Sequence, residues 1–226
     1  MKLQYLDQGH VELIDHMGDD RRVVEAARIS FKGQPYTDER DTKLIHYLVK
    51  HGHHSPLEQV VFVFSIRLPL FIMRQLVRHR TARLNEVSGR YTQLPEEYYI
   101  PSAGQLRRQD GKNKQGSGEP ISPGLAVEMQ LQIAEQCRDA FDLYRRLINS
   151  GLSRETARIV LPLNTYTEIV WQMDLNNLLK FFDQRIHPHA QWEMQELGRC
   201  IRTLIEPIVP ESLKAWEEKK KAQEKS

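Results

Sequence analysis

Cysteine is scarce in this chain of 226 residues, which contains two, Cys137 and Cys200. Both lie in helix-like patterns, and neither has the basic surroundings that would activate a thiolate. Two isolated cysteines favour structural thiols over a disulfide framework or a cysteine-based zinc site. We therefore expect no mechanism that depends on a cysteine nucleophile.

Long apolar runs are also absent. The longest clean run, residues 60–64, is far shorter than the ~18 apolar residues of a membrane span. The segment MKLQYLDQGHVELIDHM lacks the continuous apolar core of a signal peptide. We therefore expect a cytoplasmic protein without a membrane partner. No GxGxxG fingerprint occurs, so a Rossmann turn is not expected to hold a dinucleotide.

The chain carries little net charge, +2, with 40% hydrophobic and 27% charged residues. This composition is typical of a globular protein with a substantial core, and the length fits a single domain over residues 1–226. Against this neutral background, five arginines and a single acid, Glu86, lie between Arg74 and Arg90. Such a local concentration indicates an anion site rather than a generally basic surface.

The residues within this cluster suit phosphate. Arginine binds phosphate and carboxylate groups through a planar, bidentate fork. Ser88-Gly89-Arg90 adds a hydroxyl, a flexible backbone and another guanidinium, which are the parts of a phosphate cradle. A solvated helix face is the alternative for any single arginine, but it explains the whole group less well.

Hydrophobic periodicity predicts a mixed α/β chain in which helices dominate. The expected strands cover residues 2–15, 60–68, 91–100 and 166–173. The expected helices cover residues 21–29, 38–52, 69–78, 125–149 and 188–204, with a short one carrying Arg154 and Arg158 and another capped by Asp174. Residues 81–90 are expected to form a loop, 101–124 a mobile polar loop, and 217–226 a charged tail that frays.

The motif Arg78-His79-Arg80, followed by Ser88, resembles the signature of flavin-dependent thymidylate synthases. Residues 50–58 (KHGHHSPLE), 158–164 (RIVLPLN) and 185–193 (RIHPHAQWE) are similar to further blocks of that family. The resemblance runs from about residue 11 to about residue 202. It implies a helix-rich α/β domain of mixed α+β type around a mostly antiparallel sheet. It also implies a homotetramer whose active sites are shared between chains.

The resemblance implies an enzyme that makes dTMP from dUMP. Methylenetetrahydrofolate would donate the carbon, and NADPH would reduce FAD, which supplies the hydride. The residues that match flavin contacts are His53, Ser55, Glu58, Arg78, His79, Arg80, Glu86, Asp174, Leu175, Asn176, Lys180 and His189. Lys180 departs from the His or Asn that is usual at its position.

A second set of residues matches dUMP contacts of the family. This set is Gln75, Leu76, Val77, Arg78, Glu86, Val87, Ser88, Gly89, Arg90, Arg158 and Arg185. Arg185 matches the catalytic arginine, which stabilises negative charge on the uracil ring. Ser88 is assigned to phosphate binding because the sequence places no base to activate it.

Two other hypotheses use the same residues. His53 and His54 could be surface histidines; a zinc site would need further ligands, and we expect no metal. An RNA- or single-strand-binding protein could use the arginine cluster with tyrosines 91, 98 and 99 as stacking platforms. The near-neutral charge and the lack of a nucleic-acid fold signature argue against that alternative, so no nucleic-acid partner is expected.

Overall fold

The computed structural model describes residues 1–30, 37–111, 113–114 and 116–223. Its centre is a five-stranded sheet in the order β1-β2-β3-β7-β4, in which every pairing is antiparallel. The strands are β1 (Lys2–Tyr5), β2 (Gly9–Met17), β3 (Val61–Pro69), β7 (Tyr166–Asp174) and β4 (Arg83–Glu86). The mostly antiparallel sheet and the mixed α/β class are thereby confirmed.

The adjacent interior strands β3 and β7 carry alternating buried apolar residues. Phe62, Phe64 and Ile66 are fully buried on one face of β3, as expected for a strand with side chains of period two. Phe64 pairs with Trp171 of β7, and their ring centroids lie 6.2 Å apart. Such cross-strand aromatic pairs stabilise a sheet, and burial of one face of each strand specifies the register.

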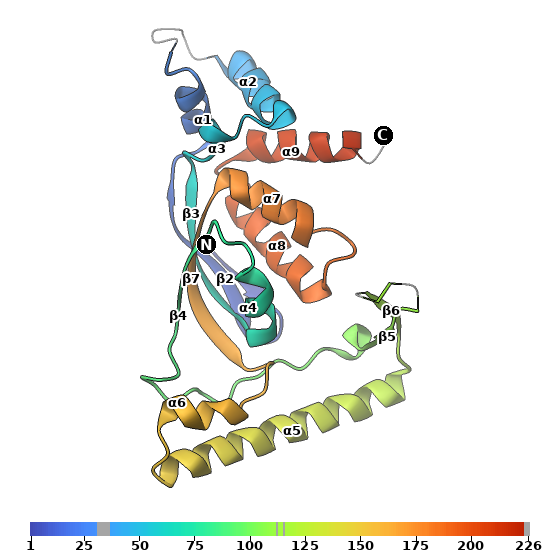
Figure 1. The fold of residues 1–226 in the computed structure, drawn as a ribbon. Coiled ribbons are helices and arrows are strands. Elements are labelled where there is room, and N and C mark those ends of the chain that lie inside the picture. Colours follow the sequence, from blue (N-terminus) through green and yellow to red (C-terminus); the bar gives the residue numbers. More distant parts are fainter. Residues whose placement is uncertain (31–36, 112, 115, 224–226) are drawn as a thin grey trace.

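Helices lie on one side of the sheet and at both ends of the molecule (Figure 1). The helices beside the sheet are α4 (Leu70–Leu76), α7 (Leu175–Arg185) and α8 (Trp192–Ile205). The helices at one end are α1 (Asp20–Ala27), α2 (Asp38–His51), α3 (His54–Leu57) and α9 (Pro210–Gln223). The helices at the other end are α5 (Pro123–Asn149) and α6 (Arg154–Ala157), which the short 3-10 turn η2 (Arg158–Val160) follows. No helix in the described ranges is long and apolar enough to cross a bilayer.

Several predicted helix boundaries are confirmed. Asp174 caps α7 by accepting a hydrogen bond from the Asn177 N–H at 2.9 Å. Gly52 ends α2 in the left-handed conformation, at φ 69°, which a glycine adopts without strain. Residues 224–226 of the tail expected to fray lie outside the described residues. The last helix, α9, continues to Gln223 rather than fraying from residue 217, because it packs on the core. Its Trp216 is buried and donates from Nε1 to Asp183 at 2.7 Å.

Several predictions of local structure were wrong. Residues 83–86 form the edge strand β4, which sequence patterning misses because all its side chains are exposed and only backbone pairing with β7 makes it a strand. Residues 91–100 form no strand beyond an isolated bridge at Tyr98; Pro95, which has no N–H to donate, interrupts them. The helix expected from Pro188 begins at Trp192, because residues 187–190 close a turn.

The polar segment 101–124 also contains regular structure. It includes the 3-10 turn η1 (Ala103–Gln105) and a hairpin of β5 (Arg107–Gln109) with β6 (Ser117–Pro120). Hydrophilic strands give no apolar alternation, so their pairing was not visible in the sequence.

Candidate functional site

The turn around α3 lies against the start of α7. His54 Nδ1 is 2.7 Å from Asn176 Oδ1, and Asn176 Nδ2 donates to Glu58 Oε1 at 3.3 Å. Asn176 is buried, so this chain of polar contacts has a fixed centre. His53, which the resemblance assigned to the flavin, is exposed, with its ring 5.5 Å from that of Tyr47. His54, and not His53, makes the contact with Asn176.

The α3–α7 contact borders a small basic cavity of about 120 Å³. His54, Asn176 and Lys180 line it, together with Lys219 and Lys220 of α9. Lys180 therefore shares this cavity with Asn176, another residue assigned to the flavin, although its charge departs from the family pattern. The α9 lysines were missed because the sequence showed only a charged tail.

Other residues assigned to the flavin differ in accessibility. The Ser55 side chain is exposed beside Glu58. The Leu175 side chain is fully buried, and its N–H donates to the Val60 carbonyl at 2.8 Å. The Leu175 side chain thus belongs to the core.

The Arg78-His79-Arg80 motif lies in the turn that follows α4, one residue after its C-cap, Val77. Arg78 and Arg80 are exposed, whereas His79 is half-buried. Arg185, the last residue of α7, donates from Nε to His79 Nε2 at 3.0 Å. The fold thus joins the predicted catalytic arginine to the centre of the motif across 106 positions of sequence.

The electrostatics of this pair follow from its burial. Desolvation lowers the pKa of His79 to about 4, and the charge of Arg185 contributes in the same direction. Desolvation also lowers the pKa of Arg185, but a guanidinium stays protonated in proteins. At neutral pH the imidazole is therefore neutral, and its Nε2 lone pair can accept the arginine N–H.

Gln75 connects the end of α4 to the loop before α8. Its Nε2 donates to Oε1 of Gln191, a residue that no sequence pattern indicated. Gln191 and the exposed His189 border the same polar cleft of about 500 Å³. Of the neighbouring predicted residues, Leu76 is fully buried, and Val77 is 46% exposed. Only Val77 of these two can therefore present its side chain to a ligand.

The residues predicted to bind phosphate meet at the end of β4. Ser88 Oγ accepts a hydrogen bond from the Arg90 N–H at 3.3 Å. Gly89 is buried against Arg158: a Cβ at Gly89 would lie 3.3 Å from Arg158 Cδ. Arg90 Nε donates to Glu155 Oε2 of α6 at 3.0 Å, a partner that no local sequence pattern indicated. The turn thus gathers two guanidiniums, a hydroxyl and close-packed backbone.

Glu86 and Val87 lead into this turn along the sheet edge. Glu86 Oε1 accepts a hydrogen bond from Thr167 Oγ1 at 2.7 Å, and the Val87 N–H donates to the Glu168 carbonyl at 2.9 Å. The Val87 side chain is 43% exposed. Pairing with β7 therefore sets the position from which the phosphate turn begins.

Most arginines of this region lack a neutralising partner. Within the described residues, arginines 74, 78, 80, 83 and 158 form no ion pair with a carboxylate, whereas Arg90 pairs with Glu155. Their guanidinium forks therefore remain available to an anionic ligand. In the same ranges, no group of three or more His, Cys, Asp or Glu side chains could hold a metal ion.

The turn around α3, which is assigned to the flavin, and the turn Ser88-Gly89-Arg90, which is assigned to the phosphate, lie at opposite ends of the sheet. Asp174 ends β7 next to α3, whereas Glu86 pairs with Ile169 of β7 and leads toward α6 (Figure 1). At about 3.3 Å per residue, the five-residue step from Ile169 to Asp174 alone spans roughly 16 Å. One chain therefore does not bring these two groups into contact.

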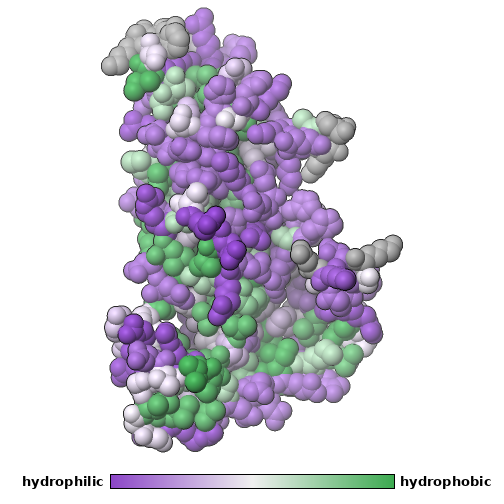
Figure 2. Space-filling view, in the orientation of Figure 1, coloured by the Kyte–Doolittle hydropathy of each residue, from purple (hydrophilic) through white to green (hydrophobic). Residues whose placement is uncertain are grey.

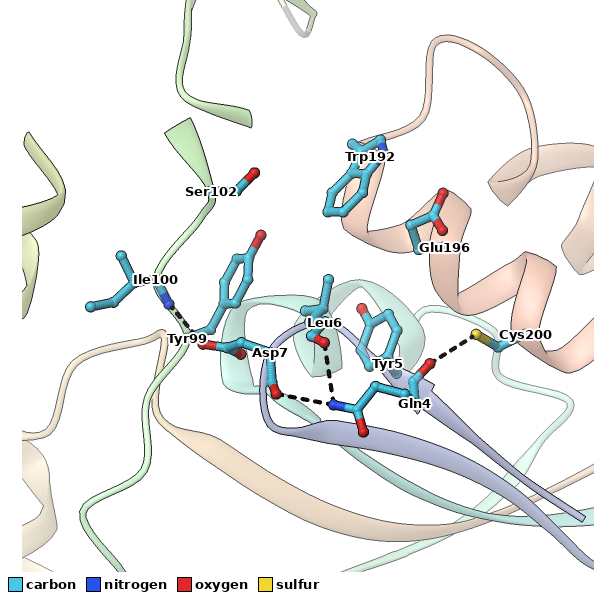
Figure 3. Close-up of a pocket in the computed structure, with 10 residues that line it drawn as sticks. All are labelled: Gln4, Tyr5, Leu6, Asp7, Tyr99, Ile100, Ser102, Trp192, Glu196 and Cys200. Carbon is cyan, nitrogen blue, oxygen red and sulfur yellow. Dashed lines mark hydrogen bonds between the residues drawn. The ribbon is translucent and has the colours of Figure 1, made fainter. Parts of the chain in front are cut away.

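A separate cavity of about 380 Å³ contains none of the predicted site residues (Figure 3). It lies between the β1–β2 turn, residues 99–102 and α8. The lining residues are Gln4, Tyr5, Leu6, Asp7, Tyr99, Ile100, Ser102, Trp192, Glu196 and Cys200. Burial raises the pKa of Cys200, and also that of Cys137, which disfavours the thiolate at both positions.

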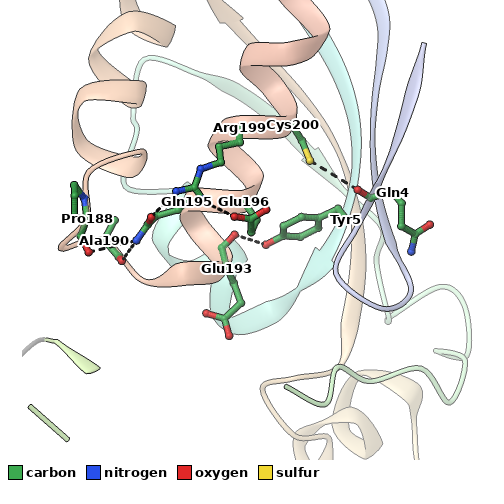
Figure 4. A network of polar contacts seen from close by, with 9 residues as sticks. All are labelled: Gln4, Tyr5, Pro188, Ala190, Glu193, Gln195, Glu196, Arg199 and Cys200. Carbon is green, nitrogen blue, oxygen red and sulfur yellow. Dashed lines mark hydrogen bonds and ion pairs between the residues drawn. The ribbon is translucent and has the colours of Figure 1, made fainter. Parts of the chain in front are cut away.

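Polar contacts beside this cavity hold the start of α8 (Figure 4). Tyr5 Oη donates to the Glu193 carbonyl at 2.9 Å, and Gln195 Nε2 donates to the Ala190 carbonyl at 2.8 Å. Both contacts flank Gln191, the partner of Gln75. This network therefore positions the loop that borders the polar cleft.

Within the described residues, arginines without a carboxylate partner, a serine–glycine–arginine turn and a neutral histidine hydrogen-bonded to an arginine are groups whose chemistry suits an anionic ligand. Residues 12–211 match the family model described as "Thymidylate synthase complementing protein". The chain is 44% identical over 218 residues to a flavin-dependent thymidylate synthase of Thermus thermophilus, covering 96% of this chain and 79% of the relative. A flavin-dependent thymidylate synthase of Kosmotoga olearia is 42% identical over 216 residues, covering 96% and 93% of the two chains.

The fold is also similar to a solved structure. The UMP/dUMP methylase PolB from Streptomyces cacaoi, bound with 5-Br dUMP, matches with a TM-score of 0.87 and 31% identity. The match covers 96% of this chain and 97% of the PolB chain. This chain belongs to the flavin-dependent thymidylate synthase family.

Proposed function

We propose that this chain catalyses the reductive methylation of dUMP to dTMP, with methylenetetrahydrofolate as carbon donor and NADPH as reductant. Its family membership supports the flavin-dependent reaction, and its similarity to a UMP/dUMP methylase supports the nucleotide substrate. The observation that carries the proposal is the turn at Ser88-Gly89-Arg90, which packs on Arg158, an arginine without a carboxylate partner in the part of the chain that the structure describes. A cytoplasmic location is part of the same proposal.

The phosphate of dUMP would lie on the turn formed by Ser88, Gly89 and Arg90, with Arg158 beside it. The backbone and the two guanidiniums of this turn suit a dianion, which charge-assisted hydrogen bonds would hold. Glu86, which Thr167 fixes in place, would accept hydrogen bonds from the nucleoside part of the ligand. Gln75, Leu76, Val77, Arg78 and Val87 complete the proposed substrate contacts.

Arg185 would act on the pyrimidine itself. A fixed positive charge at the ring favours the form in which negative charge has developed there. The partial burial of Arg185 strengthens this effect, because water screens the charge less. The chain offers no activated cysteine, so charge stabilisation replaces thiolate attack in this proposal.

FAD, when bound, supplies the hydride for the reaction. The residues proposed to hold it are His53, Ser55, Glu58, Arg78, His79, Arg80, Glu86, Asp174, Leu175, Asn176, Lys180 and His189. The polar contacts of the buried Asn176 with the exposed His54 and Glu58 fit this role, because they offer hydrogen-bonding groups beside a basic cavity. The backbone of residues 174–176 is proposed to contribute where the buried Leu175 side chain cannot.

Active sites shared within a homotetramer would resolve the separation of the two groups along β7. A second copy could bring its phosphate turn to the flavin residues of the first. The helix α5 supports such an assembly, because Val127 and Leu131 are 51% and 65% exposed on it. Apolar side chains gather over this end of the molecule (Figure 2), and such patches mark interaction surfaces.

The test is dTMP formation by the purified protein with FAD, NADPH, methylenetetrahydrofolate and dUMP, with one component left out at a time. We expect turnover only in the complete mixture. A colourless protein that gains no flavin absorbance on incubation with FAD would refute the proposal. Turnover that continues without methylenetetrahydrofolate or NADPH would refute the assignment of that co-substrate alone.

A further inference from the structure

We propose that His79 positions Arg185 for catalysis, with His79 Nε2 accepting the Nε–H of Arg185 so that the two terminal NH₂ groups of the guanidinium face the pyrimidine. This inference rests on the proposed function, in which Arg185 stabilises charge on that ring. The contact that carries it is the 3.0 Å hydrogen bond between the two side chains.

The last turn of α7 contacts His79 through Phe181 and carries Arg185. The Phe181 ring contacts the His79 imidazole edge to face, with centroids 4.9 Å apart and an interplanar angle of 76°. Phe181 is fully buried and lies one helical turn before Arg185, so the core fixes its ring. The same turn therefore supplies the surface on which the imidazole rests and the arginine that donates to it.

The backbone of His79 is fixed as well. Its N–H donates to the Leu76 carbonyl at 3.0 Å, and its own carbonyl accepts from the Ala82 N–H at 3.2 Å. The imidazole thus has a defined position before any ligand binds. An arginine side chain has several rotatable bonds, and a fixed acceptor at Nε restricts them without using the terminal NH₂ groups.

The protonation state of His79 suits this role. With its pKa lowered to about 4, the imidazole is neutral near pH 7, and Nε2 is an acceptor. Arg185 is the charged group that faces it, and the chain neighbours Arg78 and Arg80 are exposed. Protonation would turn Nε2 into a donor and place two cations in contact. The arrangement therefore fails in acid, as the pH approaches the pKa of His79.

The experiment compares His79→Leu with His79→Gln in the full-length enzyme. Leucine fills the site without an acceptor, whereas glutamine can place an amide oxygen near the position of Nε2. We expect His79→Leu to lower kcat by about 10- to 100-fold, the scale of a misplaced catalytic group, with a smaller change in the KM for dUMP. His79→Gln should recover most of this loss. Flavin absorbance at saturating FAD confirms that both variants are loaded.

A double-mutant cycle separates positioning from direct flavin contact. If His79 acts through Arg185, His79→Leu should cost little further turnover in an Arg185→Ala background. An equal loss in both backgrounds would overturn the inference, because His79 would then act independently of Arg185. The acid limb of the kcat profile gives a second readout. It should be present in the wild type and absent in His79→Gln, which does not titrate.

Two outcomes keep this inference distinct from the proposed function. If the wild type forms dTMP and His79→Leu has the same kcat, the positioning role is overturned and the proposed function stays intact. Absence of dTMP formation by the wild type would overturn the proposed function itself. If His79→Leu does not fold, His79→Asn serves in its place, because its amide oxygen lies short of the Nε2 position. Full activity of that folded variant would also overturn the inference.

Discussion

Arg90→Ala tests the phosphate turn, the part of the site on which the proposed function depends most. In the structure, Arg90 Nε donates to Glu155 Oε2 at 3.0 Å, and the two side chains are 56% and 54% exposed. An exposed pair of this kind contributes at most about 1 kcal/mol to folding stability. We therefore expect the variant to fold, with a melting temperature close to that of the wild type.

The expected loss in binding is larger. A hydrogen bond to a charged group is worth about 1.5–3 kcal/mol. At about 1.4 kcal/mol per tenfold change, removal of the Arg90 guanidinium should weaken dUMP binding about 10- to 150-fold. The difference between a small stability effect and a large affinity effect distinguishes a ligand contact from a structural ion pair.

Calorimetric titration of the flavin-loaded enzyme with dUMP measures this affinity directly, with thermal unfolding as the control for folding. Glu155→Gln is the matched variant. It removes the carboxylate that holds Arg90 in the absence of ligand, so the affinity for dUMP should stay equal or rise. Unchanged dUMP affinity in Arg90→Ala would refute the phosphate role of this turn. A tenfold loss of dUMP affinity in Glu155→Gln would show that the ion pair with Arg90 helps to form the binding site.

Three further predictions concern other parts of the chain. Arg185→Ala should lower turnover by about 10²-fold or more with flavin still bound. Arg185→Lys should not fully restore turnover, because a point charge cannot replace the planar fork of the guanidinium. Near-normal steady-state turnover of Arg185→Ala would place the catalytic centre elsewhere. The Cys137→Ser, Cys200→Ser double variant should keep most of its turnover, and selective loss of activity in the folded protein would restore a thiolate mechanism. Trp171→Ala should lower the free energy of unfolding in urea by about 3–5 kcal/mol, since its side chain is fully buried; a loss below 1 kcal/mol would contradict its place in the core.

The sequence predicted the helices and strands that have a regular pattern of apolar residues or a recognisable cap. The buried strand β3 was recognisable from β-branched and aromatic residues, and α7 from its Asp174 cap. These signals are local, because one face of each element is buried against the core. The strand β4 lacked such a signal: all its side chains are exposed, and pairing with β7 makes it a strand.

The candidate site divides in the same way. The arginine motif and its family resemblance were visible in the sequence, because the types and spacing of those residues are unusual. The residues that surround the motif in the fold were not visible in the sequence. Glu155 and Gln191 contact predicted residues only after the chain has folded, and only then do the α9 lysines line a cavity with Asn176 and Lys180.

The sequence by itself determined which chemical groups the chain offers: a cluster of arginines, a turn suited to phosphate and no activated cysteine. Only the tertiary structure decided which of them meet. Residues 79 and 185 are 106 positions apart, and no local pattern predicts that Nε2 of the first lies 3.0 Å from Nε of the second. Packing of α4 and α7 on the same sheet brings them together. Burial then lowers the pKa of His79 and makes it an acceptor, because desolvation depends on the whole fold and not on neighbours in sequence.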